Sequence, residues 1–209
     1  MTEEWTDAAP DTMVHRLTRP ERLFDRDELL NHSKCPVPRA SGVYAWFFRP
    51  TLPGVPLEGC IAHEGMYLLY AGISPDKQGK PGSSQTLWNR LRYHYTGNAE
   101  GSTLRRTLGV LLAPESGFPL RRVGSGKRVT FTNVGERWLD VWMQENAFVT
   151  WVEHEEPWLL EDELLRTIPL PLNLKGNRHH PFAERLSGLR RKANADAREL
   201  PIVADRDPR

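Results

Sequence analysis

The sequence has few cysteines and no long hydrophobic run. Two cysteines in 209 residues are too few for a framework of disulfide bonds. The longest apolar runs, at residues 44–48 and 66–73, have the length of a strand and are far too short to cross a bilayer. Polar and acidic residues follow Met1, where a signal peptide would have basic and apolar segments. We therefore expect a cytoplasmic protein with no membrane partner.

Charge is almost balanced over the whole chain but is unevenly distributed along it. The net charge is +1. Residues 85–135 carry eight Arg and Lys against two acids, whereas residues 136–173 carry nine acids against two Arg. This division is compatible with a basic face that binds a polyanion beside an acidic face that binds a metal. It is equally compatible with two solvated faces that neutralise each other.

The apolar pattern predicts the α+β class, with a small central antiparallel three-stranded sheet flanked by helices. Strands are expected at residues 41–48, 66–74 and 148–152. Because no helical pattern lies between the first two, they are expected to pair as an antiparallel hairpin.

Helical and turn patterns divide the chain into three expected parts. Helices are expected at residues 21–31, 87–95, 102–112, 135–147 and 157–168, and a basic hairpin is expected to turn at 124–126. The parts are an N-terminal arm (1–40), a catalytic domain with insertions (41–176) and a basic helical extension (177–209).

Glu161 falls within the apolar stripe of the helix expected at residues 157–168. At 100° per residue it lies between Leu164 and Leu165, away from Asp162. An ionised carboxylate in such a stripe is costly unless it is paired or bound to a metal. Glu161 is therefore interpreted as a metal ligand or catalytic group. The alternative is a carboxylate that forms an ion pair with a nearby arginine or that reaches solvent at the end of the stripe.

Two further pairs of residues suggest a site. Arg90 and His94 lie one helical turn apart and flank the apolar stripe of their helix. Arginine offers forked donors to phosphate oxygens, so this pair would suit a phosphate group, unless Arg90 merely pairs with an acid. Tyr70 precedes Gly72 at the end of a strand, and it is either a core aromatic or directs its hydroxyl into a site that Gly72 keeps open.

Cysteines and histidines leave a weaker alternative, a metal site. Cys60 and His63 have the spacing of half a zinc site. The remaining ligands would have to come from Cys35, His179 and His180, which have no typical spacing.

In their order along the chain, these segments resemble the GIY-YIG nuclease family. In that family a Gly-Ile-Tyr strand and a Tyr-Ile-Gly strand are followed by a helix arginine, a helix glutamate and an asparagine. Residues 42–44 (GVY) and 70–72 (YAG) match the two strand signatures. Val43 and Ala71 replace the central isoleucines, which are conservative changes.

The later motifs continue the resemblance. Arg90 stands in the Arg-Leu context that the family uses, and His94 matches a histidine of the phage intron homing members. Glu161 precedes Asn173 by twelve residues, as in the excision-repair nuclease subunit.

The resemblance implies a divalent-metal-dependent endonuclease that hydrolyses phosphodiester bonds, with DNA favoured over RNA. It implies one Mg²⁺ or Mn²⁺ ion held by Glu161. Tyr44 would act as the general base or position the water, and it would need help from a nearby cation because tyrosine in water has a pKa of about 10. The implied catalytic residues are Tyr44, Tyr70, Arg90, His94 and Glu161, and the implied structural residues at the site are Gly42, Gly72 and Asn173.

Basic residues between the motifs are the expected contacts to the nucleic-acid backbone. They are Arg105, Arg106, Arg121, Arg122, Lys127 and Arg128. The alternative function is a GIY-YIG-fold module that binds nucleic acid or protein with weak or no cleavage. The oligomeric state is left open.

Overall fold

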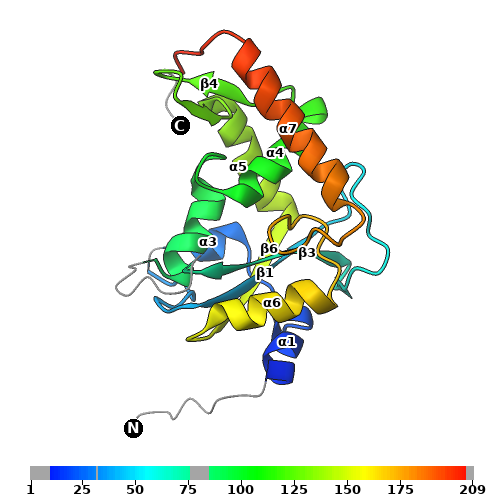
Figure 1. Ribbon diagram of the computed structural model, residues 1–209. Helices are drawn as coiled ribbons and strands as arrows, with labels where there is room; N and C mark the ends of the chain where they lie inside the picture. The colour runs from blue at the N-terminus through cyan, green and yellow to red at the C-terminus, as the bar shows by residue number, and fades with distance from the viewer. Residues whose placement is uncertain (1–9, 32, 76–84, 206–209) are drawn as a thin grey trace.

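The computed structural model describes residues 10–31, 33–75 and 85–205. Within these ranges a central antiparallel sheet has helices on both faces (Figure 1), which confirms the α+β class. The expected arm before residue 10 and the end of the extension after residue 205 lie outside the described residues. In spatial order the strands are β2 (Ala62–His63), β3 (Met66–Ser74), β1 (Gly42–Phe48) and β6 (Ala147–Glu153).

The sheet has four strands, where three were expected. β1, β3 and β6 are the expected strands, and β1 pairs with β3 in the expected antiparallel hairpin. The additional strand β2 has two residues and pairs only with Met66 and Tyr67 at the start of β3. Two residues are too few for apolar alternation to reveal a strand.

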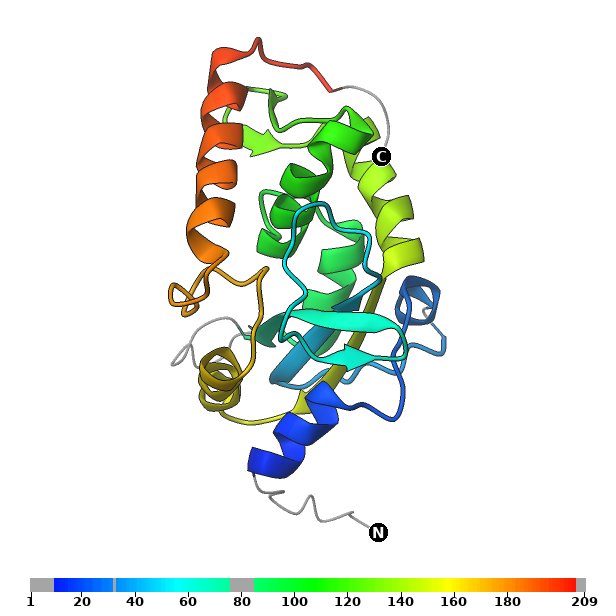
Figure 2. The same ribbon diagram turned by 90° about the vertical axis from the view of Figure 1, so that its right-hand side faces the viewer.

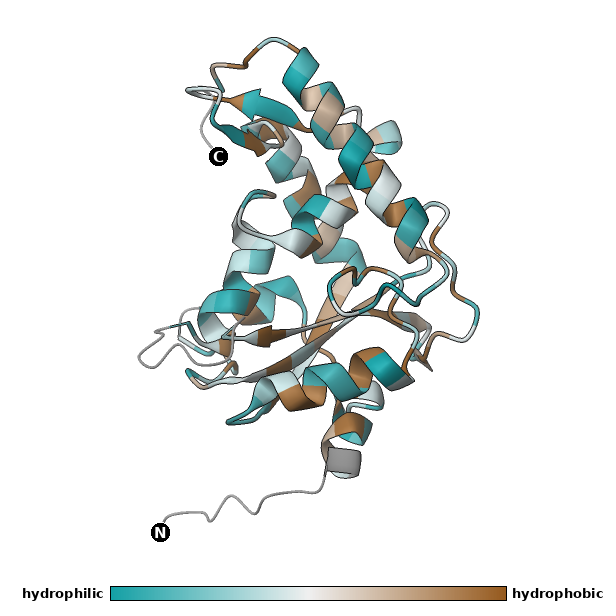
Figure 3. Ribbon diagram, viewed as in Figure 1, coloured by the Kyte–Doolittle hydropathy of each residue, from teal (hydrophilic) through white to brown (hydrophobic). Residues whose placement is uncertain are grey.

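β1 is the central strand and is buried along its whole length. Its side chains alternate between two apolar clusters, with Val43 and Phe47 in one and Tyr44 and Trp46 in the other. The strands are correspondingly apolar in Figure 3. Burial on both faces explains why the sequence of β1 reads as a continuous apolar run.

A bulge in β3 decides which face of the sheet Tyr70 occupies. Trp46 pairs with Tyr70, but the next residue of β1, Phe47, pairs with Leu68, so Leu69 is an extra residue. Strict alternation would place Tyr70 on the same face as Leu68, which is the face opposite to that of Tyr44. Because of the bulge, Tyr70 instead lies on the same face as Tyr44.

Two groups of helices cover the two faces of the sheet. α1 (Pro10–Thr18) and α6 (Pro157–Thr167) pack on one face. The other face carries α3 (Leu87–Thr96), α4 (Thr103–Ser116) and α5 (Asn133–Asn146). Outside them lie α2 (Arg26–Leu30), the hairpin of β4 (Arg121–Val123) and β5 (Arg128–Thr130), and α7 (Ala183–Glu199). α7 runs beside α4, as Figures 1 and 2 both show.

Most expected helices are present, and the N-terminal arm contains the differences. The helix expected at residues 21–31 is shorter in the structure, where α2 begins after Asp25. Asp25 accepts a hydrogen bond from the Glu28 N–H, and the Glu28 carboxylate accepts one from the Asp25 N–H, which fixes that start. α1 was not expected. No helix in the described ranges is long and apolar enough to span a bilayer.

A buried ion pair joins α4 and α5. Arg105 of α4 is 0% exposed, and its guanidinium donates to the Glu136 carboxylate of α5 at 2.7 and 3.0 Å. It also contacts Asp140 at 2.7 Å. The other Glu136 oxygen accepts hydrogen bonds from the Ala99 N–H and the Thr130 hydroxyl, so both charges are well hydrogen-bonded. The expectation that Arg105 contacts nucleic acid is therefore wrong, because its side chain is enclosed.

Arg105→Leu is expected to lower the free energy of unfolding by about 3–5 kcal/mol, because it leaves Glu136 buried without its partner. Urea denaturation followed by circular dichroism measures the change. The control is Lys192→Gln, which removes an exposed ion pair with Asp196 and should leave the midpoint unchanged. A midpoint for Arg105→Leu equal to that of the control would contradict the assignment.

Candidate active site

Tyr44 of β1 is the centre of the candidate site, and Gly72 provides the space for its ring. The two residues are paired across β1 and β3. A Cβ atom on Gly72 would lie 2.5 Å from the Tyr44 hydroxyl oxygen, closer than such atoms approach. Gly42 plays a similar part at the start of β1, where a Cβ would meet the Val152 carbonyl and the Leu87 side chain. Both glycines thus permit close packing around the site.

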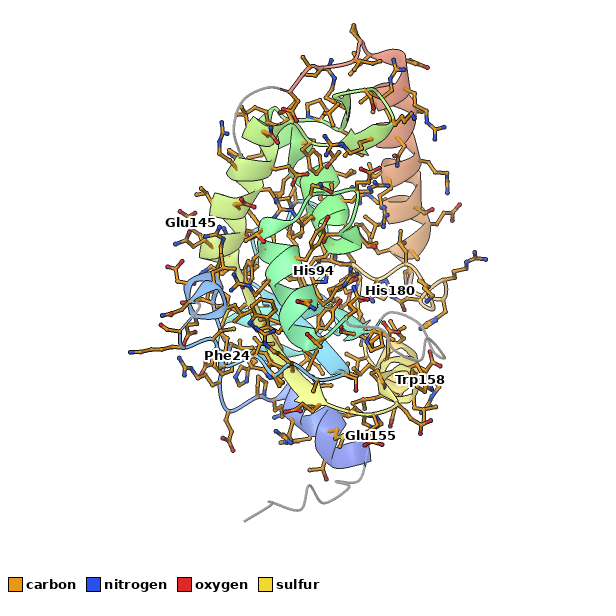
Figure 4. All side chains as sticks on the ribbon, turned by 90° about the vertical axis from the view of Figure 1, so that its left-hand side faces the viewer. Phe24, His94, Glu145, Glu155, Trp158 and His180 are labelled. Atoms are coloured by element: carbon orange, nitrogen blue, oxygen red, sulfur yellow. The ribbon has the colours of Figure 1, made fainter. Side chains whose placement is uncertain are left out.

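His94 of α3 connects Tyr44 to the helical layer. Its Nε2 lies 2.9 Å from the Tyr44 hydroxyl, and its Nδ1 lies 2.8 Å from the hydroxyl of Ser102. Figure 4 labels His94 in the interior of the molecule, where it is fully buried. Burial, followed by the charges of Arg90 and Arg105, holds the pKa of His94 well below its usual value of 6.5.

His94 is therefore neutral at neutral pH, and its hydrogen bonds are those of a neutral imidazole. One ring nitrogen donates and the other accepts. If the Ser102 hydroxyl donates to Nδ1, Nε2–H donates to Tyr44. If Nδ1–H donates to Ser102, the Tyr44 hydroxyl donates to Nε2. The three groups form a chain that can carry a proton between Tyr44 and the start of α4.

Arg90 reaches the same tyrosine from one turn earlier on α3. Its Nε donates to the Tyr44 oxygen at 3.3 Å, and its Nη1 donates to the Gly101 carbonyl at 3.4 Å. The N-cap Thr86, whose hydroxyl accepts from the Asn89 N–H, fixes where this helix begins. The positive charge of Arg90 thus lies directly beside the Tyr44 hydroxyl.

Tyr70 lies beside Tyr44, and charged groups from several elements shift its pKa. Its ring centre is 6.4 Å from that of His94. Burial raises the pKa of Tyr70 well above its usual value of 10, and the neighbouring Tyr44 raises it further. Arg90 opposes this shift and Glu161 reinforces it. Tyr70 is therefore a neutral phenol that can donate a hydrogen bond, and charges of both signs act on it.

Glu161 of α6 is half-buried and supplies the negative charge of the site. Leu164 and Leu165 beside it are buried, whereas Asp162 is exposed, as the helical geometry predicts. Among the described residues, Glu161 is the carboxylate whose charge raises the pKa of Tyr70.

In the ranges that the structure describes, no group of three or more His, Cys, Asp and Glu side chains is placed to hold a metal. The alternative site with Cys35, Cys60 and His63 is therefore not assembled, and both cysteines are free thiols. A metal at Glu161 would take its remaining ligands from water and from a bound phosphate.

Asn173 closes the edge of the sheet next to Tyr70. Its amide donates to the Ala71 carbonyl at 2.8 Å and accepts from the Ala71 N–H at 2.9 Å. The Leu172 N–H donates to the Leu69 carbonyl at 3.0 Å. These bonds pair the part of β3 that β2 does not reach, so the backbone on either side of Tyr70 is held.

Sequence reasoning missed two residues of this cluster. Ser102 is recognisable as the N-cap of α4 but not as the partner of His94. Arg190 of α7 has a positive charge that lowers the pKa of Tyr70, yet 120 residues separate them in the sequence. Only the packing of α7 against α4 reveals its position.

The other expected nucleic-acid contacts lie in different surroundings. Arg106 donates to the carbonyls of Ala99 and Val129. Arg121 and Arg122 donate to carbonyls of the C-terminal segment, at Pro201 and Leu200. Lys127 and Arg128 are exposed on the β4–β5 hairpin, at the end of the helical layer away from the sheet (Figure 1).

Comparison with known families agrees with this geometry. A family model described as the GIY-YIG catalytic domain matches residues 42–192, well over half of the chain. The matched region includes Tyr44, Arg90, Glu161 and Arg190. It indicates a nuclease-type function that acts on nucleic acids. No curated protein and no solved structure matched the chain.

Gly72→Ala is expected to lower the free energy of unfolding by about 1–3 kcal/mol, because the added methyl displaces the Tyr44 ring. Gly188→Ala is the control. Gly188 lies within α7 with nothing closer than 3.9 Å to an added Cβ, so alanine should raise the stability by about 0.5–1 kcal/mol. Equal changes in the two variants, measured by urea denaturation, would show that Gly72 is not required for space.

Lowering the pH below about 6.5 is expected to destabilise the protein through His94. The unfolded histidine binds a proton there and the folded one does not, so stability falls by up to about 1.4 kcal/mol per pH unit. Above that pH both states are neutral and the contribution is flat. Unfolding free energies measured between pH 5 and pH 8 should show a shallower acid slope for His94→Gln than for the wild type. Parallel curves would mean that folded His94 is protonated in this range.

Proposed function

The chain belongs to the GIY-YIG catalytic domain family, and from that premise we propose that it is a divalent-metal-dependent endonuclease that hydrolyses phosphodiester bonds in DNA. The observation that carries the proposal is the hydrogen-bonded group of Tyr44, His94 and Arg90, together with the charge of Glu161 that acts on the neighbouring Tyr70. A nucleophile activator, a proton acceptor, a phosphate-binding cation and a metal-binding carboxylate are the groups that such a reaction needs.

Tyr44 is assigned as the group that activates the attacking water. Its oxygen takes a proton from the water as its own proton passes to His94 Nε2, 2.9 Å away. The negative charge of a bound phosphodiester would offset the charge of Arg90, one cause of the low His94 pKa, and so ease this transfer. The Ser102 hydroxyl, hydrogen-bonded to Nδ1, holds the imidazole in place.

Arg90 and Tyr70 are assigned to the phosphate. The Arg90 guanidinium offers donors to phosphoryl oxygens on which charge develops during the reaction. The Tyr70 hydroxyl stays protonated because its pKa is raised, so it acts as a hydrogen-bond donor and not as a base.

Glu161 would hold the metal ion. Mg²⁺ is commonly bound through one or two carboxylates, with waters and substrate phosphate oxygens as the other ligands, and a single half-exposed carboxylate near Tyr70 fits this mode. When bound, Mg²⁺ or Mn²⁺ would polarise the phosphate and stabilise the leaving oxygen.

Cleavage of supercoiled plasmid, linear DNA and RNA, with Mg²⁺, Mn²⁺ or EDTA, tests the proposal. The wild type is expected to cut DNA only with the metal. Arg90→Ala and Glu161→Gln should each lower the rate by about 100-fold or more, because each removes a charge that stabilises the transition state. Asp162→Asn, at the exposed neighbouring position on α6, is the matched control and should cut as the wild type does.

The controls separate the alternatives. Cutting that persists in EDTA would contradict the role of the metal, and cutting of RNA alone would contradict the choice of DNA. Nucleic-acid binding without cutting, equal in the wild type and in both site variants, would favour a binding module instead.

A further inference from the structure

A groove of about 610 Å³ lies between α7, the start of α4 and the segment after Asn173. Its lining consists of Thr103, Leu174, Lys175, Ser187, Arg190, Arg191, Asn194, Ala195 and Arg198. Four of these side chains are cationic and none is acidic. The groove is thus strongly basic, and none of the proposed catalytic residues lines it.

One stripe of α7 forms the long wall of the groove. The lining residues from Ser187 to Arg198 recur at helical spacing and span an arc of about 140°. Leu186 and Ala197, on the adjoining face, are buried against the core, which holds the helix in this orientation. α7 is largely hydrophilic in Figure 3.

In the described part of the chain, no ion pair with a carboxylate neutralises the cations of the groove. These cations are Lys175, Arg190, Arg191 and Arg198. Lys192, which points away from the groove on the same helix, does pair with Asp196. Burial and the neighbouring Arg106 lower the pKa of Arg190. A bound anion would offset this repulsion.

Three chain segments connect the groove to the candidate active site. Thr103 directly follows Ser102, whose hydroxyl contacts His94. Leu174 directly follows Asn173, which holds β3 next to Tyr70. Arg190 lines the groove, and its charge also acts on Tyr70. The groove therefore adjoins the candidate active site.

We propose that this groove binds the phosphate backbone of the DNA strand as it leaves the active site. The proposal rests on the proposed function, because it is the cleavage site that gives the groove its direction. Along α7, Arg190 and Arg198 are about 12 Å apart. Measured along the axis of a DNA duplex, where each strand carries one phosphate per about 3.4 Å, that span corresponds to between three and four phosphates of one strand. The stripe thus offers successive cations to successive phosphates.

Binding of a fluorescently labelled DNA duplex tests the groove. Every protein carries Glu161→Gln and EDTA is present, so that DNA is not cut, and anisotropy is measured from 50 to 200 mM NaCl. Combining Lys175→Gln, Arg191→Gln and Arg198→Gln should weaken binding at least about tenfold. It should also reduce the slope of log affinity against log salt by about 0.9 per cation removed. Lys192→Gln is the matched control and should change neither quantity.

The same substitutions in the cleavage-competent protein separate this proposal from the nuclease assignment. If the wild type cuts DNA and the triple variant binds and cuts as the wild type does, the groove is overturned and the nuclease assignment stands. If the wild type cuts nothing but the triple variant loses binding and salt slope, the groove stands as a DNA-binding surface, and the nuclease assignment falls together with the direction that it gives the groove. Groove-dependent binding of an RNA duplex but not of DNA would overturn the choice of DNA.

Discussion

The burial of a neutral histidine between the sheet and the helical layer is the constraint on which the rest of the structure depends. His94 satisfies both ring nitrogens with Tyr44 and Ser102. The Arg105 guanidinium donates to the carbonyls of His94 and Tyr95, and the Arg105 backbone N–H donates to the Ser102 hydroxyl. Its guanidinium also helps to keep the pKa of His94 low. The buried ion pair that joins α4 to α5 therefore also maintains the protonation state of the site.

Charges of both signs act on Tyr70 at the site. Arg90 and Arg190 act on Tyr70 from the helical layer, and Glu161 acts from α6 on the other face of the sheet. A phosphodiester is itself an anion, so cations on one side and a metal-bound carboxylate on the other would hold it from both directions. Tyr44 and Tyr70 need carry no charge of their own before the substrate binds.

The sequence predicted those parts of the site that depend on local patterns. Strand and helix periodicity placed Tyr44, Arg90 and Glu161 on the correct elements, but the bulge at Leu69 that turns Tyr70 toward Tyr44 leaves no trace in an apolar run. The expected nucleic-acid contact of Arg105 is wrong because the charge of a segment does not show which of its side chains are buried. Arg105 shares a helical stripe with Leu108 and Leu112, so the helical geometry that singles out Glu161 would also predict that Arg105 is buried.

The end of the sheet also determines where the last helix lies. Asn173 fixes its segment to Ala71, and Asn177 then donates to the carbonyls of Leu170 and Asn173, so this turn is tied to itself and to β3. α7 begins at Ala183, a few residues after Asn177, and is held against α4, where Arg190 donates to the Thr107 hydroxyl at 3.3 Å. The amide that closes the sheet beside Tyr70 therefore sets the position of the basic groove as well. Because one short segment fixes both, a shift of Asn173 would move the groove and the catalytic strand together.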